Sequence, residues 1–288
     1  KFTLEIPAIE DTPRNVLGVS LFNLTSNDEV VKVEYVDQIE YKQFWVGITQ
    51  KGSIRSFSRG RSNDRLKVNT DTASELLLFT DKGNVFKIPT FLIQNVTETE
   101  IQLDALIDGY TTKEKIIDIY SVKSYDEKRL VYFFTKKGMI KKTSLKEYDG
   151  NYAYQVAYKL KYENDVVVSV NICNEGNGNV IIATKNGMAI RFLEESVNTM
   201  GRVASGVTGI SLRDDDFVIM GKVIELKSGS TNDEIAIDNI EIDLTLTTRN
   251  KEVKVVDIND IKLQNRAGRG TTVMVTAFED EVVEAEFN

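Results

Sequence analysis

Apolar and polar residues alternate along most of the chain in short runs, and one pattern recurs. Leu130–Thr143 (LVYFFTKKGMIKKT) begins as an apolar strand, turns at Gly138 and continues as a second strand. Four further segments share this pattern, centred on Gly52, Gly83, Gly187 and Lys251. Short alternating runs bounded by turn residues are typical of half-buried β-strands, and a hairpin turn of this kind needs a residue with positive φ. The pattern therefore predicts five β-hairpins.

A second element, a strand followed by an acidic turn and another strand, alternates with these hairpins. It occurs at 18–36, 154–172, 209–224 and 270–287, with a looser copy at 102–120. The two elements together predict a repeat of about four short antiparallel strands, which is typical of propeller-like blades. We expect an all-β domain over 15–288, preceded by a linker remnant or edge strand at 1–14. An exchange of strands between the first and last repeats would hide the sheet edges.

Composition limits the chemistry that the chain can perform. The chain has no histidine and a single cysteine, Cys173, so the commonest general base and zinc ligand are missing and no internal disulfide can form. Asp214–Asp216 could bind a cation or act as paired carboxylates, as in a glycosidase, but an Asp-rich turn explains them more simply. We expect no metal, no cofactor and no catalysis by this chain. No long apolar run or signal peptide is seen, so we expect a soluble, cytoplasmic protein.

Basic residues recur at similar places in the hairpins although the formal net charge is −8. The turns carry Lys51, Lys82, Lys136, Lys137, Lys185, Arg249 and Lys251. The second strands carry Arg55, Lys87, Lys141, Lys142, Arg191 and Lys254. Further arginines lie in loops: Arg59 and Arg61 in 56–65, Arg202 in MGRVASG (200–206), and Arg266 and Arg269 in QNRAGRG (264–270).

Repetition would place these cations on one rim, and a rim of Lys and Arg is the footprint expected for a phosphate backbone. Acidic residues fall elsewhere in each repeat, for example at Asp165 and Asp280. Such segregation of charge would allow an acidic chain to hold duplex DNA. A solvated rim with no ligand is the alternative. A protein-interaction propeller would instead scatter its basic side chains over both faces.

Two stretches resemble a known family, the C-terminal domain of the A subunit of bacterial type IIA topoisomerases. FFTKKGMIKKTSLKEY (133–148) is similar to the third repeat of that domain, and ATKNGMAIRFLEESVNTMGRVASGVTGISL (183–212) to the fourth. The resemblance implies a β-pinwheel of five or six blades that exchange strands with their neighbours. It also implies binding and bending of double-stranded DNA beside the cleavage core of the same polypeptide, which in turn partners the ATPase subunit. The family's catalytic tyrosine and metal-binding carboxylates lie in regions absent from this chain.

The resemblance covers two enzymes, DNA gyrase and topoisomerase IV. Gyrase carries the heptapeptide Gln-Arg-Arg-Gly-Gly-Lys-Gly after the first repeat, where this chain has SFSRGRSNDR (56–65). The nearest match is QNRAGRG (264–270), in the last repeat. A degenerate copy there, and none in the first repeat, resembles the topoisomerase IV A subunit more than the gyrase A subunit. A gyrase-type wrapping domain stays as the alternative.

Overall fold

The computed structural model describes residues 40–60, 62–93, 100–107, 110, 113–176, 178–213, 215–225 and 242–288. The predicted linker at 1–14, the strand pair at 18–36, Arg61 and Asp214 lie outside these ranges. The described residues of Lys1–Leu77, Phe86–Thr112 and Ile119–Lys123 form one compact unit, and those of Leu78–Val85, Lys113–Asp118 and Ser124–Asn288 form another. No helix among the described residues is long and apolar enough to span a membrane.

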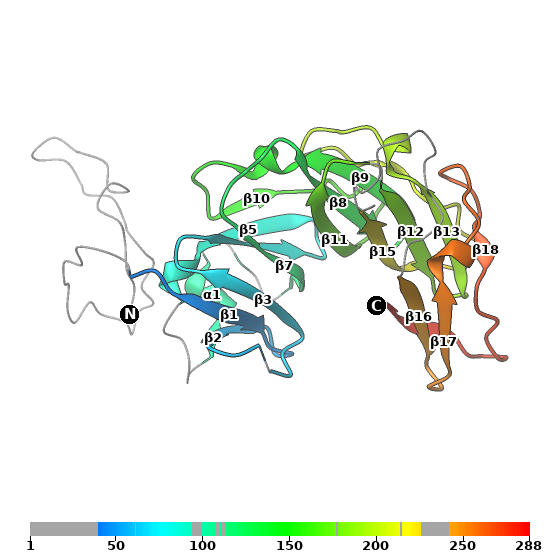
Figure 1. Ribbon diagram of the computed structural model, residues 1–288, viewed down its shortest axis with the longest axis horizontal. Coiled ribbons are helices and arrows are strands. Elements are labelled where there is room, and N and C mark those ends of the chain that lie inside the picture. Colours follow the sequence, from blue (N-terminus) through cyan, green and yellow to red (C-terminus); the bar gives the residue numbers. More distant parts are fainter. Residues whose placement is uncertain are drawn as a thin grey trace, which may run out of the picture. The chain divides into compact units, whose positions relative to one another are not determined.

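The described chain is almost entirely β-structure, arranged in five sheets (Figure 1). The first sheet has the order β3 (Leu66–Asp71), β1 (Gln43–Ile48), β2 (Ser53–Phe57), β6 (Ile101–Gln102). The second is β10 (Tyr154–Val156), β5 (Asn84–Pro89), β4 (Glu75–Thr80), β7 (Ile116–Val122). The third is β11 (Val167–Asn174), β8 (Arg129–Thr135), β9 (Met139–Ser144), β14 (Val207–Thr208).

The fourth sheet has the order β15 (Val218–Ile224), β12 (Asn179–Thr184), β13 (Met188–Leu193), β18 (Thr271–Thr272). The fifth has three strands, β17 (Val253–Asp257), β16 (Asp243–Thr248) and β19 (Val282–Phe287). Helical turns are short: η2 (Thr90–Leu92), α1 (Leu103–Leu106), η3 (Leu145–Tyr148), η4 (Glu194–Ser196) and η5 (Ile258–Asp260). The fold class predicted from the alternation, an all-β propeller-like assembly of four-stranded antiparallel sheets, is confirmed.

All five predicted hairpins form, and their turn residues have the expected positive φ. The values are 83° at Gly52, 82° at Gly83, 83° at Gly138, 70° at Gly187 and 71° at Lys251. Lysine at the fifth turn therefore adopts a backbone conformation that favours glycine.

Each turn is fixed by the threonine that lies three residues before the turn residue. Its carbonyl oxygen accepts a hydrogen bond from the turn residue's N–H at 3.0–3.1 Å. Its Oγ1 accepts a second one from the following N–H at 3.1–3.3 Å. The threonines are Thr49, Thr80, Thr135, Thr184 and Thr248. In the T-x-x-G motif, the threonine side chain therefore stabilises the turn together with the glycine.

Strands are exchanged between successive repeats, as the family resemblance implied. β14 follows β13 in the chain but pairs with β9 of the preceding hairpin, with Val207 opposite Ile140. β18 pairs in the same way with β13, and β6 with β2. The fifth sheet has no such strand against β17 within the described residues, and Val253 and Val255 there are 62% and 57% exposed.

Neighbouring sheets pack through apolar side chains. One cluster joins the third and fourth sheets through Phe134, Ile140 and Phe192, and another joins the fourth and fifth through Ile181, Leu246 and Val256. Val131, Phe133 and Ile140 of the hairpin at 130–143 are buried. Cys173 is also buried, and desolvation raises its pKa to about 12. Trp45 is only partly buried and packs against Gly60.

Candidate nucleic-acid interface

The strand cations do not occupy one equivalent position, which corrects the expectation of a single rim. Lys87, Lys142 and Arg191 are the fourth residue after their turn residue, whereas Arg55, Lys141 and Lys254 are the third. Neighbouring residues of a strand point to opposite faces of the sheet. The two sets therefore project to different sides, and they have different environments.

The fourth-position cations are buried, and each binds an oxygen atom of another part of the chain. The Nζ of Lys87 lies 3.2 Å from a carboxylate oxygen of Glu75. The Nζ of Lys142 donates to the carbonyl oxygen of Glu194 at 3.4 Å. Arg191 donates to Asn179 Oδ1 at 3.0 Å and to the carbonyl oxygen of Ile258 at 3.1 Å.

Glu194 and Ile258 are the first residues of η4 and η5. Lys142 and Arg191 therefore each bind the start of the helical turn in the following repeat. In this arrangement Lys87, Lys142 and Arg191 stabilise the fold and do not face solvent, contrary to the sequence expectation.

The third-position cations differ from one repeat to the next. Arg55 is partly exposed and forms an ion pair with Asp64 at 2.8 Å, whose hydrogen bond is the main cause of a raised Arg55 pKa. Lys254 is exposed on β17. Lys141 is fully buried, and its Nζ donates to the carbonyl oxygens of Ala157, at 2.6 Å, and Arg202. It too differs from the predicted rim position.

The turn cations are the members of the predicted set that lie most clearly at the surface. Lys51, Lys82, Lys137, Arg249 and Lys251 are exposed. Lys136 and Lys185 are partly buried, with their Nζ atoms 4.2 Å and 5.1 Å from the ring centroid of Phe217. A cation over an aromatic face is held by the ring quadrupole while part of its head group stays solvated. These turns present positive charge at the ends of successive hairpins.

The two signs of charge are not segregated, which corrects a further expectation. Asp165 Oδ1 accepts from the N–H of Lys137 at 2.9 Å, and Asp216 Oδ1 accepts from the N–H of Asn186 at 3.0 Å. Asp280 Oδ1 accepts from the N–H of Asn250 at 3.3 Å. In these three repeats the acidic turn therefore lies beside the basic turn of a hairpin and binds its main chain. The sequence signal is an Asp that recurs two residues before the start of β11, β15 and β19. In the linear pattern this Asp belongs to a different part of the repeat from the hairpin turn that it contacts.

Glu281, in the last acidic turn, contacts the side chains of basic turn residues. It forms ion pairs with Lys185, at 3.9 Å, and with Arg249. Lys185 and Glu281 are partly buried and Arg249 is exposed, and partly solvated pairs of this kind are screened by salt. They lower the net positive charge of the last two turns.

Two loops with arginine have the same main-chain environment in successive repeats. At the start of loop 200–206, the N–H of Met200 donates to the carbonyl oxygen of Lys142 at 2.8 Å. At the start of loop 264–270, the N–H of Gln264 donates to the carbonyl oxygen of Arg191, also at 2.8 Å. Each loop ends at a glycine of positive φ, Gly206 at 72° and Gly270 at 75°. Each then enters an exchanged strand, β14 or β18. We call these two segments the edge loops.

The first arginine of each edge loop is anchored to the preceding exchanged strand. Arg202 donates to the carbonyl oxygen of Val156 in β10, and Arg266 donates to that of Thr208 in β14 at 2.6 Å. Arg266 also donates to the carbonyl oxygen of Ser196 at 3.0 Å. Both arginines are partly buried, whereas Arg269 is exposed. The predicted loop cation Arg59 is exposed as well.

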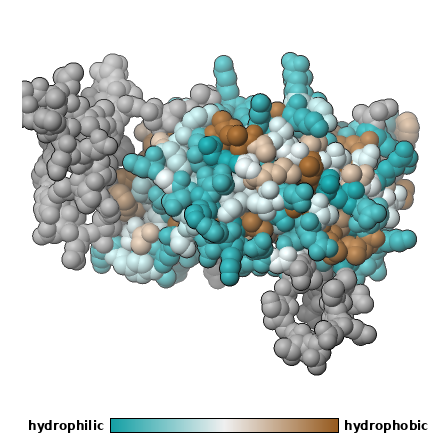
Figure 2. Space-filling view, turned by 90° about the horizontal axis from the view of Figure 1, so that it is seen from above, coloured by the Kyte–Doolittle hydropathy of each residue, from teal (hydrophilic) through white to brown (hydrophobic). Residues whose placement is uncertain are grey.

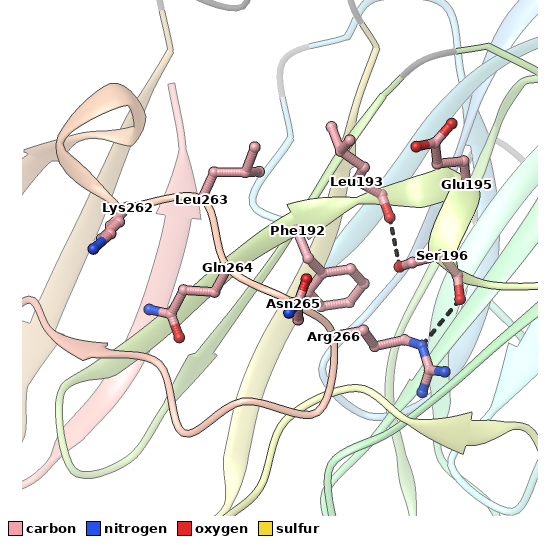
Figure 3. A pocket seen from close by; sticks show the side chains of 9 residues that line it. All are labelled: Phe192, Leu193, Glu195, Ser196, Lys262, Leu263, Gln264, Asn265 and Arg266. Carbon is pink, nitrogen blue, oxygen red and sulfur yellow. Dashed lines mark hydrogen bonds between the residues drawn. The ribbon is translucent and has the colours of Figure 1, made fainter.

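Loop 264–266 borders an open pocket of about 550 Å³ beside the end of β13 (Figure 3). Its lining side chains are Phe192, Leu193, Glu195, Ser196, Lys262, Leu263, Gln264, Asn265 and Arg266. Figure 3 shows the Arg266 guanidinium turned toward the main chain of Ser196, and Lys262 at the opposite end of the group. The rim thus combines two cations and two amides with one carboxylate, Glu195. Figure 2 shows hydrophobic residues as separate patches on a mostly hydrophilic face.

The family described as DNA gyrase C-terminal domain, beta-propeller, matches residues 74–95, 129–174, 178–219 and 253–286, half of the chain. The A subunit of DNA topoisomerase 4 from Bacillus subtilis is 28% identical over 281 residues, which cover 92% of this chain and 32% of that protein. The A subunit of DNA gyrase from Helicobacter pylori is 22% identical over 330 residues, covering 95% of this chain and 39% of that protein.

Solved structures share the fold. The crystal structure of the C-terminal domain of DNA topoisomerase IV matches with a TM-score of 0.72 and 24% sequence identity, covering 87% of this chain and 79% of that one. The chain spans between 32% and 39% of the length of the two curated relatives.

Proposed function

Because the chain belongs to the DNA gyrase C-terminal domain family, we propose that it is a non-catalytic module that binds and bends duplex DNA. It contacts the phosphate backbone without reading sequence and presents a DNA segment to the strand-passage core of a type IIA topoisomerase. Under this proposal it acts in the cytoplasm, at the nucleoid. Its partners are double-stranded DNA, the cleavage core of the same polypeptide and, through that core, the ATPase subunit.

The observation that carries the proposal is the repetition of the edge loop. Arg202 and Arg266 lie at equivalent places on the edges of successive sheets, and each follows the exchanged strand of the repeat before it. A polyanion that runs along these edges would meet a cationic loop at both the third and the fourth sheet. Phosphate contacts of this kind fix the position of DNA but carry no sequence information.

The proposed contact set is the exposed or partly exposed part of the predicted cations. The turn members are Lys51, Lys82, Lys136, Lys137, Lys185, Arg249 and Lys251. The loop and strand members are Arg55, Arg59, Arg202, Lys254, Arg266 and Arg269. Smooth bending of a site of about 20–30 base pairs costs on the order of 1–6 kcal/mol, so several distributed contacts must offset it.

Topoisomerase IV is the parent enzyme that we favour. The proposal is supported by the basic but non-matching 56–65 loop and by the degenerate heptapeptide at 264–270. A gyrase-type domain would instead wrap DNA with fixed handedness. Binding to a nicked circle, followed by ligation, separates the two: a clear positive change in linking number favours gyrase, and none favours topoisomerase IV.

Gel shifts with linear duplexes of increasing length test the proposed function itself. Charge reversal at four exposed contact residues, Lys82, Lys137, Lys251 and Arg269, should weaken binding to all sequences by about the same factor. A matched variant reverses four exposed lysines outside the set, Lys67, Lys113, Lys128 and Lys146. If both variants lose the same amount of DNA affinity, the loss reflects net charge and not the proposed contact residues. If the unaltered chain does not bind DNA, a protein-interaction module is favoured.

A further inference from the structure

Lys141 is a buried cation at a position that neighbouring repeats fill with apolar side chains. The equivalent residues, third after the turn glycine, are Phe86 and Ile190, and both are fully buried. Taking an ammonium group out of water is costly unless nearby groups compensate for the lost hydration. The presence of lysine here therefore calls for a role that phenylalanine and isoleucine do not perform.

The Lys141 side chain joins two segments that both follow it in the chain. It donates to the carbonyl oxygens of Ala157, beside exchanged strand β10, and of Arg202, in the first edge loop. Two aromatic rings face it, with the centroids of Phe133 and Tyr158 at 4.8 Å and 5.4 Å from Nζ.

The same edge loop is held at two further main-chain positions. The hydroxyl of Tyr158 donates to the carbonyl oxygen of Ser205, and the N–H of Lys159 donates to that of Ala204 at 3.4 Å. The second edge loop has a comparable main-chain bond, from the N–H of Ser211 to the carbonyl oxygen of Gly268 at 2.9 Å, but Ile190 in place of the lysine. Loop 200–206 thus has a side-chain clamp that its neighbour lacks.

We propose that Lys141 is a positioning residue that, with Tyr158, clamps edge loop 200–206 onto exchanged strand β10 and opens that loop when the amine is protonated. The clamp itself does not depend on the proposed function. Only the assignment of the clamped loop to the DNA interface rests on it. Lys141 itself does not touch DNA in this account. It sets the place from which Arg202 can do so.

The direction of the pH effect follows from proton linkage. Burial, together with the nearby charge of Arg202, lowers the pKa of Lys141 to about 7, and the charge of Glu147 of η3 partly opposes this shift. Tyr148 and Tyr158 also face the site, and desolvation raises the pKa of both, so they stay neutral near pH 9. If the loop swings out, Nζ meets water and its pKa returns toward that of an ordinary lysine. Protonation therefore favours the open loop, and the closed loop gains stability as pH rises.

Hydrogen exchange of the Ala204 and Lys159 amides reports the clamp without DNA. After correction for intrinsic rates, their protection should rise by up to about tenfold per pH unit between about pH 7 and pH 9. In Lys141→Met the dependence should vanish, while Lys128→Met, at an exposed site, should keep it. The chain has no histidine that could titrate in this range. Unchanged protection in the unaltered protein, or a change shared equally by all core amides, would overturn the clamp.

Tyr158→Phe keeps the lysine and removes one contact, so it serves if Lys141→Met does not fold. It should lower loop protection by a similar factor at every pH and leave the pH dependence in place. Loss of the pH dependence in this variant would count against Lys141 as its source.

Duplex DNA affinity at the same two pH values and constant ionic strength tests the assignment of the loop. The unaltered protein should bind more tightly near pH 9 than near pH 7, opposite to the trend expected from slow loss of lysine charge. Lys141→Met should show no such gain. A pH-dependent clamp without a DNA effect supports Lys141 as a positioning residue and removes loop 200–206 from the proposed interface.

Discussion

The guanidinium of Arg191 donates a hydrogen bond to the carbonyl oxygen of Ile258, 3.1 Å away and 67 residues further along the chain. Arg191 lies on β13 of the fourth sheet and Ile258 begins η5 after the fifth hairpin. A side chain that would suit a phosphate is thus used to join two repeats. The described basic residues discussed above fall into two classes, buried cations that bind carbonyl or carboxylate oxygens and cations that are exposed or partly exposed at the surface.

The first prediction separates these classes by stability. Arg191→Met should lower the free energy of unfolding by about 3 kcal/mol, because the side chain of Asn179 and the carbonyl of Ile258 lose a buried donor. Lys254→Met, at an exposed site on the neighbouring hairpin, should change it by less than about 0.5 kcal/mol. Urea denaturation followed by circular dichroism measures both. Similar values for the two variants would contradict the division into buried and exposed cations.

The fifth hairpin offers a stabilising change. Lys251 has φ 71°, where the other turns have glycine. Lys251→Gly should raise the free energy of unfolding by about 0.5–1 kcal/mol, because it removes side-chain strain at positive φ. Gly187→Ala should do the opposite and strongly, since a Cβ there would lie 2.1 Å from the carbonyl oxygen of Met274. Thermal unfolding of both variants checks the signs, and a destabilised Lys251→Gly would refute the strain argument.

The acidic turns should matter for stability more than for ligand binding. Asp216 accepts hydrogen bonds from Thr184 Oγ1 at 2.7 Å, from the N–H of Asn186 at 3.0 Å and from the N–H of Phe217 at 2.9 Å. Asp216→Ala should cost about 2 kcal/mol, because three donors lose their acceptor. Asp215→Ala, next to it and exposed, removes the same charge and should cost less than about 0.5 kcal/mol. If urea denaturation gives equal losses of unfolding free energy for the two variants, the negative charge and not the hydrogen bonds would be the source of the stability.

Lys141 predicts how global stability depends on pH. Its folded-state pKa of about 7 lies below the 10.5 of an ordinary lysine, so the unfolded chain binds one proton more between these values. The free energy of unfolding should therefore rise with pH, by about 2 kcal/mol between about pH 7 and pH 9, and level off below the folded-state pKa. Lys141→Met should remove this rise. A wild-type stability that falls across the same range would show that the site does not favour the neutral amine.

The hairpins could be predicted from sequence because each is a local feature. Thr135, Gly138 and the alternating residues beside them specify the turn and both strands within a few positions. The strand exchange of β14 was suggested only by family resemblance, since alternation does not say which strand pairs with which.

The fate of the basic residues was not predictable in the same way. Lys141 and Lys142 are adjacent in sequence, but their partners lie in different later segments, at Ala157 and Arg202 for one and at Glu194 for the other. A position count from the turn residue separates the third-position and fourth-position cations, and that count was available in the sequence. Their burial was not, because it depends on the sheets that pack on each side.

The central claim is that the exposed cations of this chain bind duplex DNA through its phosphates. Its most direct test is the association constant for one duplex of fixed length, measured from low to moderate salt for the unaltered chain and for the variant with Lys82, Lys137, Lys251 and Arg269 reversed. The account predicts that log K falls linearly with log salt concentration, with a slope of about 0.9 per neutralised phosphate, and that the variant has a shallower slope. An affinity that does not change with salt, or equal slopes in the two proteins, would contradict it.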